Sequence, residues 1–146
     1  MIEVSCGLIL NNQHEALMTL RFSDRLCPSM WEMPGGKREP NETGPECLAR
    51  ELREELGVIV TVRPRVLAVA TFEWDDQKNP GEFVFVQCTL YHAIITAGQP
   101  QPLDAAALAY YDLTYARRHR PLCPSAYMFY PHAVRYINRL KQGLPF

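Results

Sequence analysis

Residues 36–58 read GKREPNETGPECLARELREELGV, and this stretch decides the fold. Its second half carries Glu51, Glu54 and Glu55 at offsets of 0, 3 and 4. In a helix these offsets place all three carboxylates on one face, where like charges destabilise an isolated helix. A hard divalent cation with oxygen ligands resolves that conflict, so the spacing predicts a magnesium site.

Local signals mark both ends of this helix. Thr43 and Glu46 fit a capping box, and Pro45 stands in the first turn, where its missing N–H costs little. Gly57 is the expected terminating residue. Leucines at a spacing of four form the stripe that we expect to face the core, with the carboxylates at its edge: Leu48, Leu52 and Leu56.

The same segment has a defined pattern: Gly36, then Glu42, then residues 50–58, RELREELGV. It resembles the Nudix box at every defined position, which is a far more specific match than a lone glycine-rich triplet. The stretch from Met30 to Val62 is similar to the MutT and CTP pyrophosphohydrolase branch, whose members hydrolyse nucleoside triphosphates to monophosphate and pyrophosphate. The resemblance implies an α/β fold, the Nudix-type α/β/α sandwich with a mixed central sheet.

The resemblance also implies a set of metal ligands. The carboxylates of Glu51, Glu54 and Glu55 and the carbonyl of Gly36 would hold Mg²⁺ or Mn²⁺, which neutralises developing charge and activates a water. Arg50 lies four residues before Glu54, so its charge fits a helix salt bridge. The family pattern instead implies that Arg50 orients a ligand carboxylate.

Two acidic residues have open roles. Glu42 is either a surface charge of the loop or a partner of the Arg50 network, and its place in the box favours the network. In MutT-like enzymes the water-activating base corresponds to Glu51, whereas other branches use an acid from a later loop. Asp104 is the only acid in residues 100–109 and is the alternative candidate, although a turn aspartate is the simpler explanation.

Candidate substrate contacts surround the box. Lys37 and Arg21 are either phosphate contacts or solvated surface charges. Glu32 is a candidate polar contact for a base. Large side chains that either stack on a base or pack the carboxyl-terminal helix on the sheet are Trp31, Met33, Tyr127 and Phe129.

Residues 124–131, PSAYMFYP, are similar to the loop that carries a base-reading aspartate or asparagine in nucleotide-sanitising relatives. Ser125 and Ala126 occupy those places here. We therefore expect weak discrimination between guanine and its 8-oxo form.

Composition agrees with one globular domain over residues 1–146, with 47% hydrophobic and 21% charged residues. A net charge of −1 gives no sign of a nucleic-acid-binding surface, so a small nucleotide is the expected partner and nucleic acid is not. No apolar run reaches membrane-spanning length and no signal peptide is evident, which predicts a cytoplasmic protein without membrane contact. Five cysteines without a Cys-x-x-Cys pair indicate reduced thiols.

The rest of the chain predicts a scaffold of strands and one further helix. We expect a hairpin from residues 4–10 and 16–20, two strands in residues 58–74 broken near Pro64, and a loop over residues 75–81. A long strand over residues 82–95, a short strand over residues 108–113 and an amphipathic helix over residues 131–141 follow.

The expected function is metal-dependent hydrolysis of a nucleoside triphosphate. Hydrolysis of RNA 5′ ends or of dinucleotide polyphosphates is an alternative, but it calls for a basic groove that the net charge of −1 does not favour. A non-catalytic nucleotide-binding module is another, but such relatives usually lose glutamates of the box, and here all are intact.

Overall fold

The computed structural model describes residues 1–76 and 78–144. Its elements, in chain order, are β1 (Ile2–Leu8), β2 (Ala16–Leu20), β3 (Trp31–Glu32), β4 (Gly35–Lys37), α1 (Gly44–Leu56), β5 (Ile59–Val62), β6 (Ala68–Asp75), β7 (Phe83–Ala97), β8 (Ala107–Tyr111), α2 (Leu113–His119) and α3 (Pro124–Lys141). The prediction of one strand on each side of Pro64, and of one long strand after the loop, is therefore confirmed. Gln77, in the predicted loop, lies outside the described residues.

The strands form two sheets. The larger has the order β4-β1-β7-β5, with β6 also paired to β7, and the smaller has the order β3-β2-β8. β1 runs parallel to β7, whereas the other strand pairs are antiparallel, so the predicted mixed sheet is confirmed. β7 is long enough to pair with β6 along its first half and with β5 along its second.

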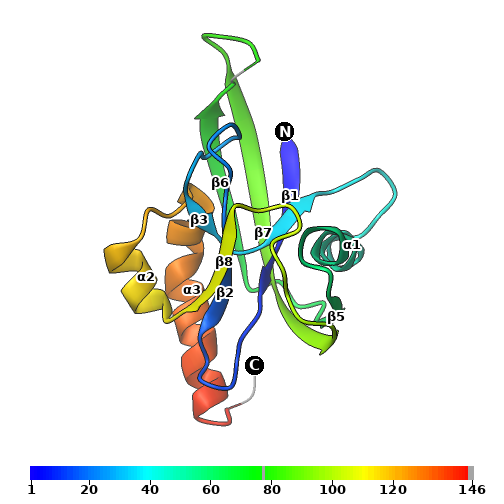
Figure 1. The fold of residues 1–146 in the computed structure, drawn as a ribbon, viewed down its shortest axis with the longest axis vertical. Coiled ribbons are helices and arrows are strands. Elements are labelled where there is room, and N and C mark those ends of the chain that lie inside the picture. Colours follow the sequence, from blue (N-terminus) through cyan, green and yellow to red (C-terminus); the bar gives the residue numbers. More distant parts are fainter. Residues whose placement is uncertain (77, 145–146) are drawn as a thin grey trace.

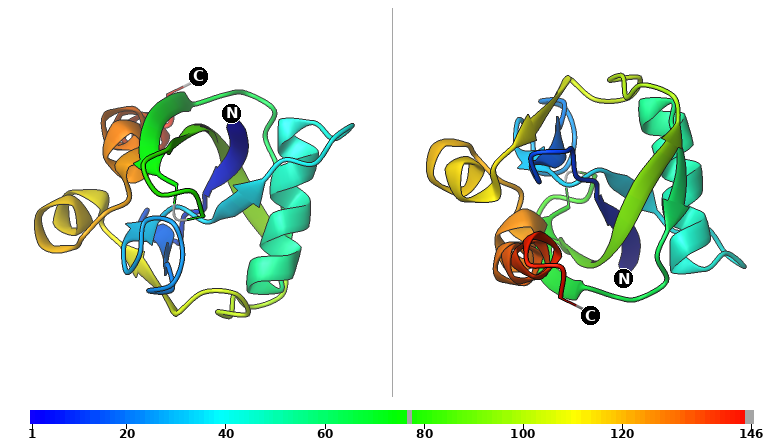
Figure 2. Two further views of the ribbon diagram at one scale, coloured as in Figure 1. Left: turned by 90° about the horizontal axis from the view of Figure 1, so that it is seen from above. Right: turned by 90° about the horizontal axis from the view of Figure 1, so that it is seen from below.

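Helices cover both sides of the strands. α1 packs on β1, β4 and β5, and α3 packs on β6 and β3, with α2 beside α3. Seen from the side or from either end, the strands lie between α1 and the α2–α3 pair (Figures 1 and 2). This arrangement is the predicted α/β/α sandwich. None of the described helices is long and apolar enough to cross a bilayer.

The helices α1 and α3 each cover a hydrophobic core, and α2 contributes Leu113 and Ala116 to the core under α3. The cluster under α1 contains the predicted leucine stripe together with Ile9, Leu17 and Val58. The cluster under α3 contains Phe129 and Ala133 with residues of β1, β2, β6 and β7. Burial of apolar area on both sides fixes the two helices on the strands.

The ends of α1 lie where the local signals predict. The Glu46 backbone N–H donates to the Thr43 hydroxyl at 3.2 Å, and the Thr43 N–H donates to the Glu46 carboxylate at 3.3 Å. Gly57 has φ of 70°, and its N–H donates to the Arg53 carbonyl at 3.0 Å. Only a residue that tolerates the left-handed region closes a helix in this way without strain.

The predicted hairpin of residues 4–10 and 16–20 is wrong, except for the turn that joins the two segments. β1 pairs with β4 and β7 in one sheet, and β2 pairs with β3 and β8 in the other. Only Leu10 and Ala16 form an antiparallel bridge between the two segments. The side chain of Asn11 accepts from the N–H groups of Gln13 and Glu15, so the local turn signal is correct. Pairing beyond that turn depends on distant strands that occupy both edges of each segment.

The carboxyl-terminal helix begins earlier than predicted. α3 starts at Pro124, so Pro131 lies inside the helix and not at its start. Pro131 removes one backbone donor, whereas the first two turns bury Ser125, Ala126 and Phe129. Tertiary packing therefore outweighs the local signal.

The end of the predicted strand 108–113 is also wrong. β8 ends at Tyr111, and Leu113 begins the short helix α2. Asp112 caps this helix by accepting from the Tyr115 N–H at 3.0 Å.

Candidate active site

Two elements that are adjacent in the sequence bring the acidic residues together. β4 runs beside α1, and a Cβ at Gly36 would collide with the carboxylate of Glu51. A Cβ at Gly35 would likewise collide with the Ser5 carbonyl of β1. Glycine at both positions lets the backbone of β4 lie directly against a carboxylate of the helix, as a shared ligand site requires.

Arg50 is held by several carboxylates. Its guanidinium donates to both oxygens of Glu42, at 2.6 and 3.1 Å, and to Glu51 at 2.9 Å and Glu54 at 3.4 Å. It also donates to the Lys37 carbonyl of β4 at 3.0 Å. These bonds hold the pKa of Glu42 down at about 2 and raise the pKa of Arg50. The guanidinium therefore orients the Glu51 carboxylate and ties α1 to β4.

Glu55 is a buried carboxyl among other carboxyls. Burial raises its pKa to about 8, and repulsion from Glu32, Glu51 and Asp104 contributes, while a hydrogen bond from the Gly35 backbone opposes the shift. Burial also raises the pKa of Glu51, against the effect of Arg50. Keeping these groups ionised together costs free energy unless a cation lies between them.

The third glutamate differs from the other two. The side chain of Glu54 is 61% exposed and does not line the cavity described below. Within the described residues, no three acidic, histidine or cysteine side chains form a complete metal site. The Gly36 carbonyl accepts a long hydrogen bond from Cys47 Sγ at 3.5 Å. The donor set nevertheless suits a hard cation, because Glu51 lies against Gly36 and the buried Glu55 supplies further carboxylate oxygens, which ionise together at least cost when a cation lies between them.

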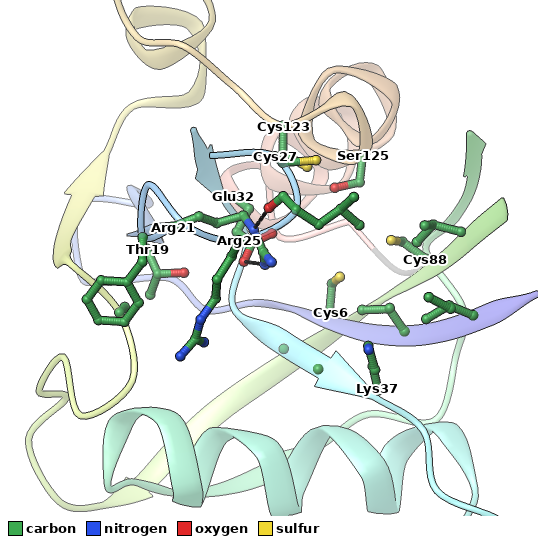
Figure 3. Close-up of a pocket in the computed structure, with 18 of the residues that line it drawn as sticks. Cys6, Thr19, Arg21, Arg25, Cys27, Glu32, Lys37, Cys88, Cys123 and Ser125 are labelled. Atoms are coloured by element: carbon green, nitrogen blue, oxygen red, sulfur yellow. Dashed lines mark hydrogen bonds and ion pairs between the residues drawn. The ribbon is translucent and has the colours of Figure 1, made fainter. Parts of the chain in front are cut away.

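Glu51 and Glu55 belong to the lining of a cavity of about 680 Å³, and Figure 3 shows other side chains that line it. Glu51 and Glu55 line it from α1, and Gly36 and Lys37 line it from β4. Apolar side chains line it from β3–β4, β6 and β7, among them Met33, Phe72 and Val86. A cavity that combines an acidic wall with apolar walls suits a ligand that has both a charged and an apolar part.

Arg21 and Glu32 form an ion pair within this cavity. Arg21 Nη1 donates to Glu32 Oε1 at 2.8 Å, and Arg21 Nε donates to the Leu26 carbonyl. Burial raises the pKa of Glu32, against the effect of Arg21. The cation predicted as a phosphate contact is thus already engaged by a carboxylate.

The large side chains named from the sequence separate into two groups. Met33 is buried and lines the cavity. Trp31 lies outside the cavity lining and packs edge-on against Tyr111, with ring centroids 5.2 Å apart. Tyr127 also lies outside the lining, on the surface of α3, and is 47% exposed. Phe129 is fully buried in the core under α3. Of these four side chains, the structure places only Met33 in the cavity lining, where a base could reach it.

Asp104 and Ser125 also line the cavity. Both oxygens of Asp104 accept from Arg25, at 2.8 and 3.2 Å. Ser125 is buried in the first turn of α3. Thr19 lines the cavity as well, and sequence reasoning missed it. The available signal was a hydroxyl inside the otherwise apolar strand ALMTL.

Comparisons with known proteins find matches in sequence and in structure. The family model described as the NUDIX domain matches residues 1–132. The 8-oxo-dGTP diphosphatase of Proteus vulgaris is 37% identical over 60 residues, which are 41% of this chain and 54% of that protein. The CTP pyrophosphohydrolase of Escherichia coli K12 is 42% identical over 62 residues, which are 42% of this chain and 45% of that protein. The alignments thus span about half the length of these curated relatives.

Solved structures extend the likeness to the whole fold. The MutT protein from Methanosarcina mazei Go1 superposes with a TM-score of 0.74 at 22% identity, covering 97% of this chain and 95% of that one. The solution structure of the E. coli ORF135 protein gives a TM-score of 0.71 at 26% identity, covering 97% and 92%.

Proposed function

Because this chain belongs to the NUDIX family, we propose that it is a hydrolase that uses a divalent metal ion to cleave a nucleoside triphosphate to the monophosphate and pyrophosphate. Relatives named CTP pyrophosphohydrolase and nucleoside triphosphatase support a triphosphate substrate. Mg²⁺ or Mn²⁺ suits the oxygen donors described above.

One observation carries the proposal. Two carboxyls of α1, Glu51 and Glu55, face the same cavity beside the Gly36 backbone, and Glu55 is buried among like charges. A fold built only for stability gains nothing from this arrangement, since burial of an unpaired carboxyl is costly. Functional sites are where such perturbed groups gather.

The residues of the chain have distinct tasks in the proposed reaction. Glu51, Glu55 and the Gly36 carbonyl would hold the ion, with Glu54 as the further ligand that the family pattern implies. When bound, the divalent ion neutralises charge on the phosphates and makes a bound water more acidic. Arg50 keeps the Glu51 carboxylate in place through its 2.9 Å hydrogen bond. Lys37, on the cavity wall, meets the phosphates as a point charge.

The two candidates for the general base differ in their contacts. Both oxygens of Asp104 are committed to Arg25, whereas Glu51 shares one oxygen with Arg50 and faces the cavity beside Gly36. Proton transfer requires the base to lie within hydrogen-bonding reach of the attacking water. We therefore propose Glu51 as the base.

The apolar part of the cavity is the proposed base pocket, and its selectivity is proposed to be weak. Ser125 lines the cavity at the place where relatives carry longer polar side chains. A short hydroxyl makes few hydrogen bonds to the edge of a base, so the wrong base leaves few buried polar groups unpaired and is rejected only weakly. We expect the catalytic efficiencies for 8-oxo-dGTP and dGTP to differ by less than about a thousandfold, which is roughly 4 kcal/mol.

A substrate panel tests the proposal. Purified protein is assayed with Mg²⁺, with Mn²⁺ and with chelator against nucleoside triphosphates, dinucleotide polyphosphates, nucleotide sugars and triphosphorylated RNA, and the products are separated by ion-exchange chromatography. We expect metal-dependent release of monophosphate and pyrophosphate from a triphosphate. Turnover of only RNA ends or dinucleotide polyphosphates, or turnover that persists without metal, would contradict the proposal.

A further inference from the structure

A buried hydroxyl without a partner lies in the wall of the cavity. Thr19 is 1% exposed, and its Oγ1 is the one buried side-chain oxygen or nitrogen of the described residues that lacks a hydrogen bond. Valine has nearly the same shape, favours strands equally and would carry no such cost. A threonine at this place therefore indicates a polar partner that arrives with the ligand.

The neighbour of Thr19 across the strands is a carboxylate. Thr19 of β2 and Glu32 of β3 are directly opposed in the antiparallel register, so their side chains share one face. Only Oε1 of Glu32 accepts from Arg21 within the described residues, which leaves Oε2 available to a ligand. Figure 3 shows both side chains among those above α1.

This pair faces the catalytic helix and not α3. Leu17 belongs to the core under α1, and Thr19 lies two residues further along β2, on the same face. Glu32 is close enough to Glu55 for their repulsion to contribute to the raised pKa of Glu55. The pair thus lies beside the end of the cavity where the phosphates would be held.

The chemistry of the pair restricts what it can bind. An ionised carboxylate accepts hydrogen bonds and repels a phosphate, so the incoming group must be a donor. The Thr19 hydroxyl needs an acceptor for its proton. A single hydroxyl of the ligand satisfies both, because it donates to Glu32 Oε2 and accepts from Thr19 Oγ1. In a nucleotide, hydroxyls occur on the sugar, which links the phosphates to the base.

We propose that Thr19 and Glu32 bind the 2′-hydroxyl of the substrate's sugar, so that the enzyme prefers ribonucleoside triphosphates to 2′-deoxyribonucleoside triphosphates. The inference rests on the proposed function and adds the sugar class to it. A site that binds a hydroxyl through buried polar groups rejects the analogue that lacks it, because those groups then stay unpaired.

The test is the ratio of kcat/KM for matched pairs such as CTP and dCTP or GTP and dGTP. We expect the parent protein to favour the ribonucleotide at least about tenfold, the effect of one hydrogen bond lost. Thr19→Val should lower this ratio about tenfold, and Thr19→Ser, which keeps the hydroxyl, should retain it. Thr61→Val, an exposed strand position outside the cavity lining, is the matched control and should leave the ratio unchanged.

Stability separates a change in recognition from a failure to fold. Thr19→Val should melt no lower than the parent, since it removes an unpaired buried hydroxyl. The inference is overturned if the parent hydrolyses both sugars with equal efficiency, or if Thr19→Val keeps the parent ratio. If no triphosphate is hydrolysed at all, the proposed function fails and the inference fails with it.

Discussion

The two long helices of this protein have different origins. α1 begins and ends where Thr43 and Gly57 place it, and its capping hydrogen bonds are all present. α3 begins without a side-chain cap and continues through Pro131. Local chemistry defines the first helix, whereas packing against β6 and β3 defines the second. The carboxylates proposed to bind the metal belong to the first helix, where a local pattern can be recognised without the fold.

Truncating the core under each helix should produce the largest effects on stability. Phe129→Ala in α3 should lower the free energy of unfolding by about 3–5 kcal/mol, and Leu52→Ala in α1 by about 2–5 kcal/mol, because both side chains are fully buried. Chemical denaturation measures both. Tyr127→Ala, exposed on α3, is the control and should change stability by less than about 0.5 kcal/mol. An unchanged denaturation midpoint for Leu52→Ala would show that α1 does not rest on this core.

Removing an acid from α1 should affect turnover and not folding. Glu55→Gln or Glu54→Gln should reduce kcat at least about a hundredfold, the scale on which one preorganised charged group acts. Stability should hold or rise, since the amide relieves like-charge repulsion and, at Glu55, the cost of burying a charge. Steady-state kinetics with Mg²⁺ and thermal melts check both outcomes. Glu73→Gln, on β6 outside the cavity lining, is the control. Near-parental turnover in either α1 variant would remove that residue from the site.

The attachment of α3 to β7 should depend on pH. His92 Nδ1 and the Tyr136 hydroxyl are 2.6 Å apart, and burial lowers the pKa of His92 to about 4. The unfolded chain binds a proton as the pH falls through about 6.5, but the folded chain does not. This contribution to stability is therefore present above about pH 6.5 and is lost towards pH 4, with about 2 kcal/mol lost by pH 5.

Denaturation of His92→Asn at pH 7.5 and pH 5 measures this contribution. The free energy of unfolding of this variant should fall between pH 7.5 and pH 5 by about 2 kcal/mol less than that of the parent. His132→Gln, which changes an exposed histidine of α3, should retain the parental loss. Equal losses in the parent and His92→Asn would contradict the assignment.

The smallest expected changes in stability have opposite signs in α1 and α3. Thr43→Ala removes the cap of α1 and should cost about 1 kcal/mol. Pro131→Ala should instead stabilise the protein by about 1 kcal/mol, because it restores a backbone donor inside α3. Thermal denaturation compares the two. A loss of stability in Pro131→Ala would show that the proline ring itself supports the packing of α3.

The sequence by itself determined the Nudix box, both ends of α1 and the positions of most strands. These features depend on neighbours within a few residues, so capping boxes, leucine spacing and glycine identity suffice to find them. Only the tertiary structure decided that β1 and β2 enter different sheets, that α3 begins at Pro124, and that Trp31 and Tyr127 lie outside the cavity whereas Thr19 lines it. Strand pairing and burial bring together residues that are far apart in the chain. The free-energy cost of an unpaired hydroxyl or of a proline inside a helix therefore depends on the distant residues that pack against it.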